Sequence, residues 1–259
     1  TLLDEGEYLC SERTMYRVLA ANQPVRERRR QREHPPYTKP QLLATGPNQV
    51  WSWDVTKLLG PQKWTYFYLY VLLDIFSRYV VGWMVADREN SALAGRLITE
   101  TCHKQGVQPQ VLTLHSDRGA PMTSKCTAQL LADLGVTRSL SRPQVCDDNP
   151  FSEAQFKTVK YHPDFPSRFG DIAAAITFCR GFFPWYNTEH RHGGIAMITP
   201  DDVHHGRAKA VLEQRERVLH LAWRKRPERF VQGTPKPSPL PEAVWINPPI
   251  TSNNGGTAH

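Results

Sequence analysis

The chain has 259 residues, of which 40% are hydrophobic, and this is enough to bury the core of one large domain or of a core with appendages. Its net charge of +7 suggests a polyanionic partner, and the excess lies in two flanks, residues 26–39 and 207–229. It contains no run of about 18 apolar residues and no basic-then-apolar leader, so we expect no membrane span and no signal peptide.

The five cysteines are widely scattered and form no CxxC pair. We therefore expect neither a zinc ribbon nor a compact disulfide framework. The pattern favours the reducing cytoplasm as the location of the protein. Because the chain begins with Thr1 rather than Met, we expect it to be a fragment or a processed chain.

Residues 1–25 contain one predicted helix, which begins after Ser11 as N-cap and places Met15, Val18 and Leu19 on one stripe. The segment resembles the last helix of a helix-turn-helix. A short surface helix that packs on the core is the alternative, since no preceding helix is present to complete the motif.

Residues 26–47 form a basic segment with several prolines, which predicts an extended linker. We expect its arginines to contact phosphates of the polyanionic partner, and these are Arg26, Arg28, Arg29, Arg30 and Arg32.

Residues 48–206 carry the predicted core, which opens with a strand around Asp54. Alternation places Asp54 on one face of this strand and the apolar side chains on the other, namely Trp51, Trp53 and Val55. Aromatic and β-branched runs at 64–75 and 79–85 predict two more strands, so we expect an antiparallel meander.

Helix and strand alternate after the meander. The predicted segments are helix 93–102, strand 111–114, helix 127–134, strand 137–140 and a helix from Asn149. A meander followed by βα units resembles the α/β ribonuclease H-like fold, with five strands in one mixed sheet flanked by helices.

Two further acids occupy marked positions in this pattern. Asp117 follows the apolar run 111–114 and precedes a turn, so we expect it at the carboxyl end of a strand beside that of Asp54, where α/β sheets place ligands. Glu153 lies just inside the helix that begins with Asn149 as N-cap and Pro150 at the first helical position.

Three converging acids repel one another unless cations lie between them, which favours a Mg²⁺ or Mn²⁺ site. Two such ions suit phosphoryl transfer, because they can hold the attacking and the leaving oxygen. Any one of these acids alone is more typical of a solvated surface group, and only the joint pattern favours a site.

The helix of Glu153 also presents Lys157 and Lys160 on the same face. A solvated, mutually paired face is one interpretation of this pattern. The other interpretation is that these lysines contact a phosphate of the polyanionic partner beside the acids.

Beyond Tyr161, residues 172–186 predict an apolar helix interrupted by Gly181 and Pro184. Residues 200–223 contain a second long helix rich in arginine, and residues 207–229 are predicted to be a basic helix. His190 and His192 are more typical of loop or DNA-backbone residues than of metal ligands. The Pro-rich residues 230–259 predict an extended or disordered tail.

The segments WSWDVTK, LHSDRGAPMTS and DNPFSEAQFKTVKY resemble the three acidic motifs of the retroviral-integrase-like transposases. The spacing of 35 residues between Asp117 and Glu153 is similar to that superfamily's signature. The wording around the acids resembles the second-reading-frame transposase of the third bacterial insertion-sequence family, and so do FFPWYNTEHRHGGIAMITPDDVHHGRA and RPERFVQGTPKP.

This resemblance implies that Asp54, Asp117 and Glu153 are the catalytic, metal-binding acids of a transposase that cuts at a mobile element's ends and joins them to target DNA. It implies Mg²⁺ or Mn²⁺ as cofactor, two ions in the active complex, and Lys160 at the DNA end. A homo-oligomer on DNA is expected, in the bacterial cytoplasm and associated with the nucleoid when DNA is bound.

Two alternatives remain open. A ribonuclease H-type nuclease would share the fold and the metals but would not need the basic flanks. A DNA-binding protein derived from a transposase would typically have lost an acid, whereas all three acids are present here.

Overall fold

The computed structural model describes residues 8–21, 37–143, 145 and 148–249, and the chain divides into two units, Thr1–Thr38 and Lys39–His259. In the first unit, α1 (Glu12–Ala21) begins where predicted, and the Ser11 hydroxyl accepts a hydrogen bond from the backbone N–H of Thr14 at 3.3 Å. None of its residues is buried. The assignment of this helix to a helix-turn-helix therefore stays a prediction.

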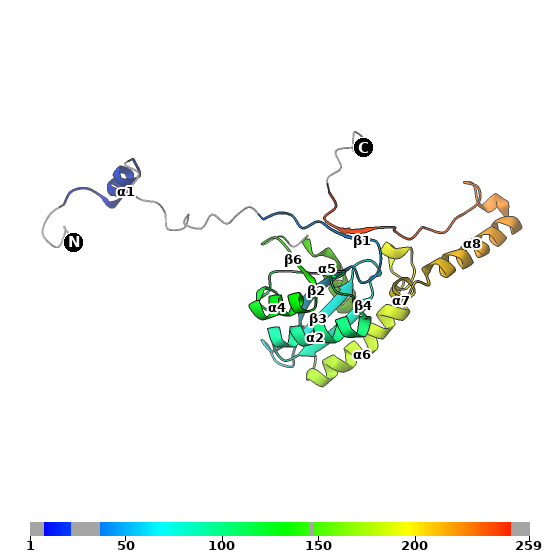
Figure 1. The fold of residues 1–259 in the computed structure, drawn as a ribbon, viewed down its shortest axis with the longest axis horizontal. Helices are drawn as coiled ribbons and strands as arrows, with labels where there is room; N and C mark the ends of the chain where they lie inside the picture. Colours follow the sequence, from blue (N-terminus) through cyan, green and yellow to red (C-terminus); the bar gives the residue numbers. More distant parts are fainter. Residues whose placement is uncertain (1–7, 22–36, 144, 146–147, 250–259) are drawn as a thin grey trace. The chain divides into compact units, whose positions relative to one another are not determined.

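The second unit is built on the predicted five-stranded mixed sheet, in the order β4-β3-β2-β5-β6 (Figure 1). The first three strands form an antiparallel meander, whereas β5 lies parallel to β2 and β6 parallel to β5. The strands are β2 (Val50–Leu59), β3 (Tyr66–Asp74), β4 (Val80–Ala86), β5 (Thr113–Ser116) and β6 (Thr137–Leu140).

Helices cover both faces of this sheet. One core packs α2 and α4 against the face that carries Trp51 and Trp53, and another packs α5 and α6 against the opposite face. The predicted ribonuclease H-like α/β architecture is therefore confirmed. The helices of this unit are α2 (Ser91–Gln105), α3 (Ala120–Thr123), α4 (Lys125–Asp133), α5 (Pro150–Lys160), α6 (Ile172–Thr188), α7 (Pro200–His204) and α8 (Ala208–Lys225), with 3-10 turns at Gly193–Ile195 and Pro227–Arg229.

Strand β5 begins two residues later than the predicted run 111–114. The backbone N–H of Val111 is bound in a turn to the carbonyl of Gln108, and Thr113 is the first residue that pairs with β2. The shift moves the end of the strand to Ser116, so that Asp117 follows it directly.

The predicted interruption of the helix at 172–186 is wrong, because α6 runs unbroken through Gly181 and Pro184. A proline inside a helix removes one backbone hydrogen bond, but Phe183 and Tyr186 around it are almost fully buried. Burial of these aromatic side chains offsets the loss. The local signal was overridden by tertiary packing.

The predicted linker and tail both contribute to the core, which the sequence reading did not anticipate. Strand β1 (Leu42–Ala44) pairs antiparallel with β7 (Val244–Ile246). Ala44 and Ile246 are fully buried in a cluster with Ile75, the residue that follows β3. Residues 244–246 are therefore extended as predicted, but they are packed rather than free.

No helix in the described ranges is both long and apolar enough to cross a membrane.

The packing of β7 predicts that Ile246→Ala destabilises the protein by about 2–5 kcal/mol, because it leaves a cavity in a filled cluster. Leu43→Ala in the paired strand is the control, since Leu43 is 42% exposed and should cost far less. Urea unfolding of the two variants and the parent measures the difference. Equal stability of Ile246→Ala and the parent would show that β7 is not part of the folded core.

Candidate active site

Each of the three predicted acids lies on or directly after the strand or helix that was predicted for it. Asp54 is in the middle of β2, and Asp117 follows β5, the parallel neighbour of β2 in which Ser116 pairs with Trp53. Glu153 is in the first turn of α5, which packs against β2. Two adjacent strands and one helix thus bring the acids to one part of the sheet.

Asp117 and Glu153 lie close enough to Asp54 for their charges to affect it. Burial is the largest cause that raises the pKa of Asp54 to about 7, and a hydrogen bond of 2.7 Å from the backbone N–H of Val55 to its Oδ1 lowers it. Neighbouring negative charges raise the pKa further, and they belong to Asp117, Glu153 and Glu89. Asp54 is therefore costly to ionise unless a positive charge is nearby.

Within the described ranges, no three His, Cys, Asp or Glu side chains lie close enough together to hold one metal ion. The three acids thus form an acidic neighbourhood and not a closed set of ligands. Carboxylate oxygens remain the donors that Mg²⁺ and Mn²⁺ prefer, and the raised pKa of Asp54 marks a place that favours a cation.

The face of β2 that carries Asp54 is tied to α5. The Ser52 hydroxyl donates to Asn149 Oδ1 and accepts a hydrogen bond from the Ser152 hydroxyl, and all three side chains are buried. Asn149 is at the N-cap position as predicted, but its side chain makes no capping hydrogen bond, because Ser52 occupies it. This contact fixes the start of α5, and with it Glu153, against the strand.

The other end of α5 is held through Lys160. Its Nζ donates to Thr56 Oγ1 at 2.7 Å, so this lysine is directed toward the strand face that carries Asp54. Lys157, one turn earlier, and Lys160 itself are both exposed, and the hydrogen bond to Thr56 is what distinguishes Lys160. Of the other predicted DNA contacts, Arg26, Arg28, Arg29, Arg30 and Arg32 lie outside the described residues.

Two polar residues near the acids were not predicted from the sequence. Glu89 follows the carboxyl end of β4, and an acid at that end of a strand was the available signal. Ser141 follows β6, and its hydroxyl donates to Asp117 Oδ1 at 2.7 Å. A single serine in a loop gives no comparable signal in the sequence.

The two histidines that were expected in a loop have identified contacts. The ring of His190 stacks on Tyr186, with ring centroids 5.3 Å apart. His192 Nδ1 accepts a hydrogen bond from the backbone N–H of Gly194. Their interpretation as loop or DNA-backbone residues remains a prediction.

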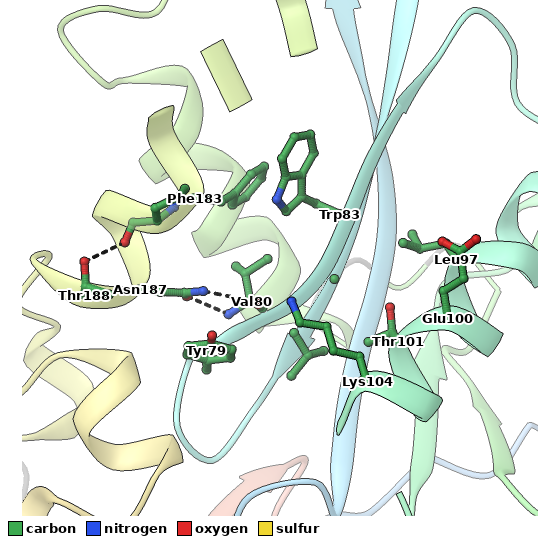
Figure 2. A pocket seen from close by; sticks show the side chains of 13 residues that line it. Tyr79, Val80, Trp83, Leu97, Glu100, Thr101, Lys104, Phe183, Asn187 and Thr188 are labelled. Carbon is green, nitrogen blue, oxygen red and sulfur yellow. Dashed lines mark hydrogen bonds between the residues drawn. The ribbon is translucent and has the colours of Figure 1, made fainter. Parts of the chain in front are cut away.

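A cavity of about 400 Å³ lies elsewhere, beside the edge strand β4 and between α2 and α6 (Figure 2). Asn187 lies at this cavity, where its side-chain amide binds both the N–H and the carbonyl of Val80. None of the three acids lines this cavity. It is therefore separate from the acidic neighbourhood.

Comparison with known proteins shows which protein families this chain is similar to. Residues 44–146 match a family model described as integrase core domain, and residues 134–200 match a second model with the same description. The chain is 32% identical over 160 residues to the transposase for insertion sequence element IS904 of Lactococcus lactis subsp. lactis (strain IL1403), which covers 61% of this chain and 62% of the relative.

A second relative is the transposase InsF for insertion sequence IS3A of Escherichia coli (strain K12), which is 32% identical over 171 residues and covers 62% of this chain and 55% of the relative. The chain thus spans less than two thirds of the length of these relatives. A chain in the structure of the simian T-cell lymphotropic virus intasome in complex with PP2A regulatory subunit B56 gamma is 19% identical, with a TM-score of 0.50. That match covers 76% of this chain and 71% of the other, and it supports the fold.

The raised pKa of Asp54 predicts that Asp54→Asn stabilises the apo protein at pH 8, by up to about 4 kcal/mol at about 1.36 kcal/mol per pKa unit. Between about pH 4 and 7 the folded parent holds a proton that the unfolded chain has lost, so its stability falls as the pH rises through this window. The Asn variant lacks this fall.

Urea unfolding at pH 5 and pH 8 in the presence of a chelator measures the effect. Asp133→Asn, at an exposed position of α4, is the control and should follow the parent at both values. Parallel stability curves for Asp54→Asn and the parent would contradict a raised pKa.

Proposed function

We propose that the chain belongs to the integrase core superfamily, among the transposases of bacterial insertion sequences, and that it is a polynucleotidyl transferase that moves such an element. It cuts DNA at the element's ends and joins the freed 3′ hydroxyl to target DNA. The observation that carries this proposal is Asp54, whose pKa is raised by burial and by the charges of Asp117 and Glu153 beside it.

The carboxylates of this acidic neighbourhood are the donor type that divalent cations prefer. Asp54, Asp117 and Glu153 would hold Mg²⁺ or Mn²⁺, two ions in the active complex, through carboxylate oxygens. When bound, the ions would activate the attacking oxygen and stabilise the charge that develops on the phosphate. Binding of a cation would also relieve the repulsion that raises the pKa of Asp54.

The protein's own residues would position the nucleic acid. Lys160 lies beside the face of β2 that carries Asp54, so it would hold a phosphate next to the scissile bond. Lys157 would add positive charge on the exposed side of α5. The basic residues 26–32 and 207–229 would neutralise phosphates farther along the duplex without reading its sequence.

The proposed partners are the element's ends, the target DNA and further copies of this chain. Joining two ends to one target needs an active site at each end, so a homo-oligomer on DNA follows from the proposed reaction. Products with joined strands separate this function from that of a ribonuclease H-type nuclease, which only cuts.

We predict that Asp54→Asn, Asp117→Asn and Glu153→Gln each abolish cleavage and joining in Mg²⁺ while DNA binding is largely kept. Each change removes the charge of one carboxylate ligand, which weakens metal binding while the fold is kept. Incubation with radiolabelled element ends and a target plasmid measures both steps, and a gel-shift assay measures binding.

Asp133→Asn serves as the matched control, since this acid is exposed on α4 and should leave both steps unchanged. A triad variant that joins strands as well as the parent does would exclude that residue as a catalytic ligand. Ca²⁺ in place of Mg²⁺ should support binding but no chemistry.

For the lysines, we predict that Lys160→Ala reduces joining and affinity for the element's ends more than Lys157→Ala does. Both changes remove one charge from the same helix, but only Lys160 is directed toward β2. The Lys160→Arg variant should keep the attraction to phosphate but place the strand less well, because guanidinium and ammonium groups differ in shape. Joining measured across a salt series tests this, and equal losses for Lys157→Ala and Lys160→Ala would favour a merely solvated face.

A further inference from the structure

Ser141 is in direct contact with Asp117, one of the three acids. It follows β6 and is only 2% exposed, and its hydroxyl donates to Asp117 Oδ1 at 2.7 Å. Its backbone is also held, because its N–H donates to the carbonyl of Ser116 and its carbonyl accepts from Arg118 Nε at 2.8 Å. The backbone of Ser141 is therefore held in place, and this positions its hydroxyl to bind Asp117.

The direction of this hydrogen bond is set by His115, which is fully buried. His115 Nε2 lies 2.8 Å from the backbone carbonyl of Asp148, and since a carbonyl can only accept, Nε2 must carry the proton. Nδ1 then accepts from the Ser139 hydroxyl at 2.9 Å. The same Nε2–H lies 3.3 Å from Ser141 Oγ, which leaves the Ser141 hydroxyl free to donate to the carboxylate.

Asp148 gives this chain of hydrogen bonds a rigid end. Its carboxylate accepts from the backbone N–H and the guanidinium of Arg142 at 2.9–3.1 Å and from Asn247 Nδ2 at 2.8 Å. The hydrogen bond from the Arg142 side chain is the largest cause that holds the pKa of Asp148 well below its usual range. The carbonyl that orients His115 thus belongs to a residue fixed on several sides.

We propose that Ser141 is a positioning residue for Asp117, with His115 and the carbonyl of Asp148 holding it in place. The inference rests on the proposed function, in which Asp117 is a metal ligand. The carboxylate of an aspartate rotates broadly about χ2. A hydrogen bond from Ser141 to Oδ1 of Asp117 restricts this rotation, and it thereby fixes the position of Oδ2 as well. Ligating carboxylates are commonly oriented in this way by an outer hydrogen bond.

A merely structural hydroxyl makes a different prediction, and the chain offers a matched control for it. Ser77 is also buried, and its hydroxyl donates to the carboxylate of Asp74 at the same 2.7 Å. Asp74 is not one of the three acids. Ser77→Ala removes the same kind of hydrogen bond from the fold without touching Asp117.

The test compares Ser141→Ala, Ser77→Ala and the parent, each as the full chain. Mn²⁺ affinity is measured by titration, with electron paramagnetic resonance detecting the free ion, and stability is measured by thermal melting. We expect Ser141→Ala to weaken Mn²⁺ binding about 10–100-fold, as outer partners of metal ligands do. Ser77→Ala should lower the melting temperature and leave Mn²⁺ affinity at the parent's value. Ser141→Cys keeps the shape of the side chain with a slightly larger atom and donates weakly, so it should also lose affinity. It gives a second variant if Ser141→Ala does not fold.

Parental Mn²⁺ affinity in both folded Ser141 variants would overturn the inference, and so would an equal loss of affinity in Ser77→Ala. Strand joining by the parent tests the proposed function separately. If the parent joins no DNA but its Mn²⁺ affinity depends on Asp117 and on Ser141, the positioning role stands and the assigned reaction does not.

Discussion

The burial of Asp54 beside other acidic side chains is the constraint on which the rest of the site depends. A carboxylate in the middle of a packed strand loses hydration and meets the negative charges of Asp117 and Glu153, so its pKa rises to about 7. One backbone hydrogen bond from Val55 offsets part of this cost. The fold therefore maintains a place whose energy improves when a proton or a cation arrives, which is the property that a metal-dependent active site requires.

The surrounding structure holds this unfavourable arrangement by binding on either side of it. Ser52 and Thr56 are the strand residues that flank Asp54 on the same face, and both bind α5, through Asn149 and Lys160 respectively. The strand period of two thus attaches the helix at two points, with the acid between them. Glu153 is positioned as a consequence of these contacts.

Asp117 is supported from a different direction, by elements that come from distant parts of the chain. Strand β7 pairs with β1, and the residue that follows it, Asn247, donates to the Asp148 carboxylate at 2.8 Å. Asp148 in turn accepts a hydrogen bond from His115, two residues before Asp117. The C-terminal arm is thereby connected to the loop that precedes α5, so the part of the chain that reads as a tail contributes to the shape of the site.

The sequence by itself determined the elements whose signals are local. Alternating apolar residues marked β2 and placed Asp54 opposite Trp51 and Trp53, the turn after Asp117 marked a strand end, and Pro150 marked the start of α5. Short connections predicted the antiparallel meander, and the βα units after it resembled the ribonuclease H-like fold, which implied a strand beside β2 for Asp117. The resemblance to a known family rested on the residues around the three acids together with the spacing between Asp117 and Glu153.

Only the tertiary structure decided the features that depend on contacts between distant residues. The pairing of β1 with β7, the passage of α6 through Pro184, the diversion of the Asn149 side chain to Ser52 and the support of Asp117 by Ser141 have no signature in local periodicity. Each is selected by burial or by a polar group that must find a partner once water is excluded. Those demands exist only after the chain has folded, and for that reason the residues that hold the acids could not be found by reading along it.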